Sequence, residues 1–177
     1  MDLNDIRDLV IRYDILLIIS LTQHWLLYEI FTPLTLYPLF WIISIFTKAM
    51  ILPLTSTIET SGLTFSLVPA CVAGSAYYLL LILNLTTKMT FTQRLKSILF
   101  ILTTFYVLNL IRLLVFVFLY SSTVPFTDSL HIITWYIVSI LFVVGIWFYN
   151  VYLFKIGGLP IVDDFSDLWN AIKNRKQ

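Results

Sequence analysis

Charged residues are scarce in this sequence. Only 12% of its 177 residues are charged, whereas 59% are hydrophobic and the mean hydropathy is +0.92. In a soluble domain roughly a quarter of the residues are charged, so this chain has too few charged residues for a surface that faces water on all sides. The composition excludes a typical soluble protein and predicts a membrane protein. At about 20 residues per span, the length allows one domain with about five spans.

Cysteine and basic clusters are also scarce. Cys71 is the sole cysteine, which excludes a disulfide within the chain. The formal net charge is +1 and no basic cluster is present, so no nucleic-acid partner is expected. The first fourteen residues mix acidic and basic side chains. Because a secretory signal begins with a positive stretch, no cleavable signal peptide is expected.

Five apolar segments predict an all-α membrane protein, a bundle of about five transmembrane helices. The first segment contains Gln23, His24 and Glu29, which leaves open a poor span or an interfacial helix. The predicted segments are Leu9–Ile30, Thr35–Leu54, Ala70–Leu85, Ser97–Tyr120 and Leu130–Phe154.

Basic residues in the connections predict the orientation. Lys88, Arg94 and Lys96 lie between the third and fourth segments, and a second basic group runs from Lys155 to Lys176. Cytoplasmic connections carry the excess of Lys and Arg, so both stretches are expected in the cytoplasm and the N-terminus outside. We expect residues 1–155 to form one transmembrane domain, with the catalytic elements in 56–154, and residues 156–177 to form a cytoplasmic tail.

The outer connection before the third segment has a pattern of its own. Apolar and polar residues nearly alternate from Leu63 to Val68, which indicates a short strand. Ser61-Gly62 resembles a turn, and residues 56–60 are the expected partner strand. The sequence therefore predicts a small extracytoplasmic β-hairpin that leads directly to Cys71.

Arg112 is the only arginine inside the four predicted segments that follow the first. Placing an arginine near the centre of a bilayer costs about 2.5–3.5 kcal/mol, so such residues usually have a function. Asn109 lies three positions earlier, on the same helix face. Arg112 is therefore expected to hold an anion or a carbonyl oxygen. The alternative is a structural arginine bonded to carbonyls of neighbouring helices.

Cys71 and His131 each open a predicted span at the outer face. Pro69 suits a first helical turn, and a cysteine at a helix N-terminus forms a thiolate more readily. Cysteines in membrane helices are, however, mostly small apolar fillers. His131 follows Asp128 by three positions and is a candidate base for Cys71, whereas Asp128 is the expected helix cap or support. An interfacial histidine is the alternative.

Together these residues supply a thiol nucleophile, a base and a cation on three successive helices. Such a set suits acyl transfer with a stabilised oxyanion. The ordered stretches resemble the exosortase/archaeosortase family of membrane cysteine transpeptidases, and this chain resembles a short, divergent archaeosortase-like member. The stretches that carry the resemblance are Val68–Ser75, Asn109–Arg112 and Ser129–His131. One departure is that Gly74 lies three residues after Cys71, where the family often has glycine two residues after.

The resemblance implies Cys71, Arg112 and His131 as catalytic residues, with no metal or cofactor. It implies a plasma-membrane enzyme of a bacterium or archaeon with its site at the extracytoplasmic face. The implied substrates are exported proteins with a C-terminal hydrophobic sorting helix. The enzyme would cleave near a short motif and transfer the new C-terminus to a lipid or cell-envelope acceptor.

A non-enzymatic membrane module, such as a transporter subunit or assembly factor, is the alternative function. In that case Arg112 binds an anionic group or a partner helix, and Cys71 is a filler. The position of Arg112 relative to Cys71 and His131 distinguishes the two hypotheses.

Overall fold

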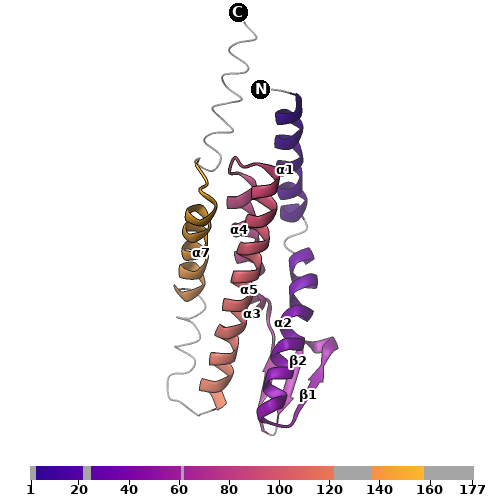
Figure 1. Ribbon diagram of the computed structural model, residues 1–177. Helices are drawn as coiled ribbons and strands as arrows, with labels where there is room; N and C mark the ends of the chain where they lie inside the picture. The colour runs from indigo at the N-terminus through magenta and orange to yellow at the C-terminus, as the bar shows by residue number, and fades with distance from the viewer. Residues whose placement is uncertain (1–2, 22–24, 61, 122–136, 158–177) are drawn as a thin grey trace, which may run out of the picture.

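The computed structural model describes residues 3–21, 25–60, 62–121 and 137–157. Helices make up most of this part of the chain, and a small sheet lies beside α2 at one end (Figure 1). The helices are α1 (Leu3–Leu21), α2 (Trp25–Phe46), α3 (Pro69–Val72), α4 (Gly74–Leu85), α5 (Phe91–Ser121) and α7 (Ser139–Phe154), with a 3-10 turn η1 (Pro53–Thr55). The strands are β1 (Ala49–Leu52), β2 (Thr57–Thr60) and β3 (Thr64–Ser66).

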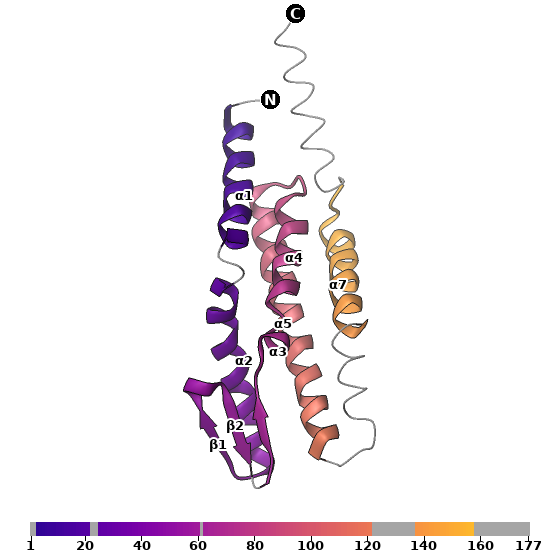
Figure 2. The same ribbon diagram turned by 180° about the vertical axis from the view of Figure 1, so that it is seen from behind.

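Two of these helices, α2 and α5, are long and apolar enough to cross a membrane. α5, with 31 residues, is the longest described helix, and α4 and α7 pack along it at the end away from the sheet (Figures 1 and 2). α4 and α7 are apolar but shorter, with 12 and 16 residues. The helical class is therefore confirmed and α2 and α5 are candidate spans, whereas a bundle of five spans stays a prediction.

The boundary between the first two predicted segments is wrong. Residues 25–30 of the first predicted segment belong to α2, which runs without a break from Trp25 to Phe46. Residues 35–54 do not form one span, because α2 ends at Phe46 and β1 begins at Ala49. Hydropathy alone could not separate these elements, since an apolar strand and an apolar helix of this length have the same composition.

The predicted hairpin is confirmed, and a third strand joins it. β2 pairs antiparallel with β3, and Gly62 with φ 118° lies in the turn between them. β1 pairs antiparallel with the other edge of β2, giving the order β1-β2-β3. The sheet packs on α2 and α5 through the buried Ile58 side chain. It therefore fixes the chain that leads to Cys71 against these two helices.

Proline shapes the contact between α2 and α5. Pro38 lies inside α2, and it has no N–H to donate to the carbonyl of Leu34. The Tyr106 hydroxyl from α5 donates to that same carbonyl oxygen at 2.8 Å. The freed carbonyl of α2 thus becomes an acceptor for the neighbouring helix. Such replacement is required in an apolar environment, where an unpaired carbonyl is costly.

Aromatic rings form the centre of the helical core. Tyr77 of α4 is fully buried, stacks on Phe31 of α2 at 3.8 Å and meets Phe105 of α5 edge-on at 4.8 Å. These three rings tie α2, α4 and α5 together. The Cys71 turn lies between this core and the sheet, so both of its flanks are held in place.

Candidate functional site

Cys71 lies on a separate helical turn between the sheet and α4. Pro69 takes the first position of α3, with its preceding residue extended, as expected for proline. The helix stops after one turn because Ala73 adopts a left-handed conformation with φ 57°. α4 starts only at Gly74. The expectation that Cys71 opens the long third helix is therefore wrong, since the left-handed residue breaks the helix after it.

Asn109 and Arg112 of α5 both donate to the backbone carbonyl of Cys71. The Asn109 Nδ2 to Cys71 O distance is 3.0 Å, and the Arg112 Nη2 to Cys71 O distance is 3.4 Å. Both donors are buried, with exposed fractions of 2% and 9%. The spacing of three residues puts them on one helix face, as the sequence predicts. The structure thus brings three of the predicted site residues together, around a main-chain oxygen.

Ser139 is a member of this cluster that the sequence analysis missed. Its Oγ accepts a hydrogen bond from Arg112 Nη1 at 2.7 Å. Ser139 is the first residue of α7, so the guanidinium bridges α7 and the Cys71 turn. The signal in the sequence is weak, because one serine in an apolar segment is common. Ser139 becomes a candidate site residue only because the structure pairs it with the buried Arg112.

Two hydrogen bonds account for two of the five N–H donors of the Arg112 guanidinium. The same guanidinium lies within electrostatic range of the Cys71 thiol. The hydrogen bonds of this cluster can therefore fix the Cys71 turn, and the guanidinium places a positive charge beside it.

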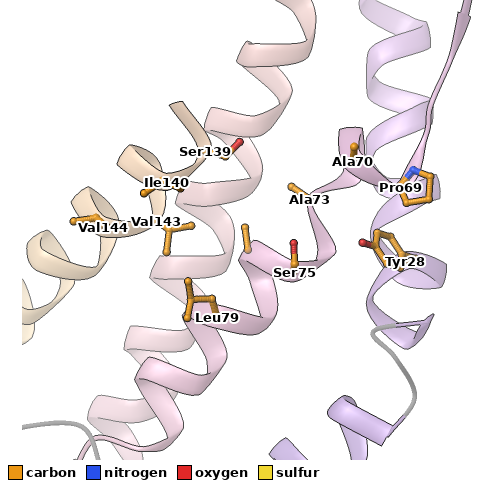
Figure 3. Close-up of a pocket in the computed structure, with 11 residues that line it drawn as sticks. Tyr28, Pro69, Ala70, Ala73, Ser75, Leu79, Ser139, Ile140, Val143 and Val144 are labelled. Atoms are coloured by element: carbon orange, nitrogen blue, oxygen red, sulfur yellow. The ribbon is translucent and has the colours of Figure 1, made fainter. Parts of the chain in front are cut away.

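Cavities lie on both sides of the Cys71 turn. One, of about 120 Å³, has Cys71 in its wall together with residues of β3 and the C-terminal part of α5. The other, of about 530 Å³, is largely apolar and includes Ser139 at one end. Its lining comes from α7, α4, α3 and Tyr28 of α2 (Figure 3). There is therefore open space next to Cys71 and next to Ser139, the partner of Arg112.

Gly74 is needed for the close approach of α2 to the start of α4. A Cβ at this position would lie 2.9 Å from two ring atoms of Tyr28. Any larger residue would push the Tyr28 ring, which forms one wall of the larger cavity (Figure 3). The position of Gly74, three residues after Cys71, thus has a packing reason in this structure.

His131 and Asp128 lie outside the described residues. The role of His131 as a base and that of Asp128 as its support therefore stay predictions.

A second buried polar cluster lies at the opposite end of α4, and the sequence analysis did not single it out. Asn84 Nδ2 donates to Ser97 Oγ at 2.5 Å, and Ser97 Oγ donates to Asn150 Oδ1 at 2.9 Å. All three side chains have an exposed fraction of 0%. Arg94 Nη1 also donates to the Asn84 carbonyl at 2.7 Å. The cluster links α4, α5 and α7, so polar contacts fix the bundle at both ends.

No protein-family model, curated protein or solved structure matches this chain.

Proposed function

We propose that this protein is a membrane-embedded cysteine protease/transpeptidase, similar to the exosortase/archaeosortase family. The observation that carries the proposal is the convergence of Asn109 and Arg112 on the Cys71 turn, beside a cavity that Cys71 lines. The substrates would be exported proteins with a C-terminal hydrophobic sorting helix. The setting would be the plasma membrane of a bacterium or archaeon, with about five spans and an extracytoplasmic site.

The proposed reaction begins when the Cys71 thiolate attacks the scissile carbonyl carbon. A bond forms between Sγ and that carbon, and the carbonyl electrons move to its oxygen. When the tetrahedral intermediate collapses, the C–N bond breaks and the amine leaves with a proton, which His131 would supply after taking it from the thiol. A lipid or cell-envelope nucleophile then attacks the thioester, transfers the substrate C-terminus and releases the Cys71 thiol. No metal or cofactor is part of this sequence.

Arg112 would have two tasks in this mechanism. Its hydrogen bonds to Ser139 and to the Cys71 carbonyl hold the turn that carries the nucleophile. Its charge would stabilise the oxyanion of the intermediate, since the guanidinium lies within electrostatic range of the thiol. Asn109 would support the same carbonyl and keep the turn in place when the guanidinium contacts the substrate.

Processing of exported proteins with a C-terminal hydrophobic helix tests the proposal. Wild-type protein and Cys71→Ala are each co-expressed with such candidates, and the substrates are followed by immunoblot. We expect Cys71→Ala to reach the membrane normally and to process nothing. Cys71→Ser should also be severely impaired, because a hydroxyl is a far poorer nucleophile near neutral pH. Normal processing by Cys71→Ala would show that Cys71 is not the nucleophile.

A non-enzymatic membrane module is the second candidate, and one observation favours it. Both hydrogen bonds of Arg112 go to groups of the protein itself, as expected for a structural arginine that locks α5 to α7 and the Cys71 turn. In this case Arg112 variants should lower the abundance of the protein, whereas Cys71→Ala should have no effect on any substrate. The two candidates therefore differ in which single substitution matters.

A further inference from the structure

The free edge of β3 is the feature that carries a further inference. In the described part of the chain β3 pairs only with β2. The backbone N–H of Leu67 donates to the Ser56 carbonyl, and that of Thr60 donates to the Leu63 carbonyl. Hydrogen-bonded pairs alternate along an antiparallel ladder, so Phe65 is the next residue of β3 that bonds to β2.

The same alternation directs the backbone groups of Thr64 and Ser66 away from β2. Both residues face Thr57 and Glu59 at non-hydrogen-bonded positions of the ladder. Both are exposed. No other described residue takes their N–H and C=O groups. β3 thus offers two donors and two acceptors at the spacing of a strand, which is a template for another extended chain.

This edge lies next to the cavity that contains Cys71. The cavity is lined by Phe65, Ser66 and Leu67 on one side, and by α5 residues that include Phe116 and Tyr120 on the other. The rings of Phe65 and Tyr120 meet edge-on at 5.9 Å. An extended segment on the edge would therefore place every second side chain toward an apolar cavity that also contains the thiol.

We propose that the β3 edge binds the segment of the substrate around the scissile bond as an added antiparallel or parallel strand. This proposal rests on the proposed function. The occupant is an extended, uncharged peptide segment: main-chain hydrogen bonds to Thr64 and Ser66 give its alignment, and one apolar side chain enters the cavity. In peptide recognition by strand addition, main-chain hydrogen bonds supply the affinity and pockets for alternate side chains supply the specificity. Cys71 follows the end of β3 by five residues, so the nucleophile comes directly after the strand that aligns the substrate.

A pair of electrophilic probes tests the edge on the purified full-length protein in detergent. Methyl vinyl sulfone reports the intrinsic reactivity of Cys71, and acetyl-Ala-Val-Ala vinyl sulfone has the same electrophile on an extended peptide. In each case the thiol adds across the double bond, and the mass of the adduct is followed with time. Each rate with Cys71 is divided by the rate of the same probe with free cysteine. We expect this ratio to be at least about tenfold higher for the peptide than for methyl vinyl sulfone, because each main-chain hydrogen bond to β3 contributes a several-fold gain in binding.

Methylation of single peptide nitrogens then tests the strand geometry. In an added strand only every second peptide N–H faces β3. Methylation of a nitrogen that faces β3 should remove most of the acceleration, whereas methylation of the neighbouring nitrogen should leave it nearly intact. An equal effect at every position would overturn strand addition.

Ser66→Pro and Ser66→Ala form a matched pair of protein variants. Both remove the hydroxyl that contacts Thr57, but only proline removes the outward N–H. We expect Ser66→Pro to lose about fivefold or more of the peptide acceleration and Ser66→Ala to keep it. Equal rates for the two variants would overturn the proposal. If Ser66→Pro fails to fold, the methylation series on the unsubstituted protein still decides.

The outcomes separate this proposal from the proposed function. If Cys71→Ala abolishes substrate processing but the peptide probe is no faster than methyl vinyl sulfone, the edge proposal fails and the nucleophile stands. If Cys71→Ala still processes substrates, the proposed function fails whatever the probes show. Failure of both probes to modify Cys71 contradicts both proposals, since an open cavity beside the thiol is then absent.

Discussion

At the scale of single residues, Arg112 has the most informative surroundings. Its side chain crosses from α5 to Ser139 of α7 and to the carbonyl of Cys71. A guanidinium can make both contacts at once because its donors form a planar fork. An ammonium group is a compact charge and has no such fork. The identity of the cation should therefore matter as much as its charge.

We predict that Arg112→Lys does not restore the activity lost in Arg112→Ala. An oxyanion donor contributes roughly 10²–10³ in turnover, and misplacement of the Cys71 turn adds to the loss. Lysine costs about as much to insert as arginine, so the variant should reach the membrane. The measurement compares the product formed with the amount of protein in the membrane.

Ser139→Ala is the matched control for Arg112, because it removes one acceptor and leaves the charge. We expect a smaller loss than for Arg112→Lys, with normal abundance. If Arg112→Lys processes substrate near the wild-type rate, the fork is unnecessary and Arg112 acts only as a charge or a structural contact.

The residue scale also shows how far the sequence predicts the site. The spacing of Asn109 and Arg112 follows from the helical period, and their approach to Cys71 was expected from chain order and topology. The bond to the Cys71 carbonyl was not predictable, because it depends on the left-handed Ala73, which ends the helix before the N–H four residues after Cys71 can donate to this carbonyl. Ala73 carries no sequence signal for that conformation, which glycine and asparagine adopt more readily.

At the scale of elements, the contact between α2 and α5 shows how a helix defect is used. Pro38 removes the hydrogen bond that the Leu34 carbonyl would otherwise accept within α2. Tyr106 supplies the replacement across the helix interface. The two residues should therefore be energetically coupled, although they lie on different helices.

We predict that Tyr106→Phe lowers the thermal stability in detergent by about 1 kcal/mol, the net value of such a hydrogen bond. In a Pro38→Ala background the backbone N–H of residue 38 can serve the Leu34 carbonyl, so the same substitution should cost much less. Thermal unfolding of the four proteins of this double-mutant cycle gives the coupling. Equal costs of Tyr106→Phe in both backgrounds would show that the Tyr106 bond does not replace the missing helix bond.

The strands of the sheet differ in how well the sequence predicts them. The β2–β3 hairpin was predictable because polar and apolar residues alternate around a glycine turn. β1 was not, because Ala49–Leu52 is as apolar as α2 and follows it after only Thr47 and Lys48. This segment forms a strand because it pairs with β2, and a local sequence pattern does not show which later segment will pair with it.

At the scale of the whole molecule, the length of α5 bears on where the site lies. Its 31 residues span about 46 Å at 1.5 Å per residue, whereas the hydrocarbon core is about 30 Å thick. Arg94 and Lys96 near its start suit the cytoplasmic interface. The far end of α5, together with the sheet, then extends toward the outer interface. Arg112 lies about 14 Å from that end, and this orientation would place it in the outer half of the membrane.

We therefore predict that the sheet and the α4–α5 connection lie on opposite sides of the membrane. Single cysteines at Leu54 and at Lys88, each in a Cys71→Ala background, allow a direct test. Leu54 is fully exposed in η1, so a membrane-impermeant maleimide should label Leu54→Cys in intact cells. Lys88→Cys should react only after the cells are opened. Native Cys71 should also be labelled from outside, but more slowly, because its side chain is partly buried. The reverse pattern, with Lys88→Cys labelled in intact cells, would invert the topology and place the Cys71 turn at the cytoplasmic face. Substrates exported across the membrane could not then reach the thiol, so this single labelling experiment bears on the orientation and on the proposed function together.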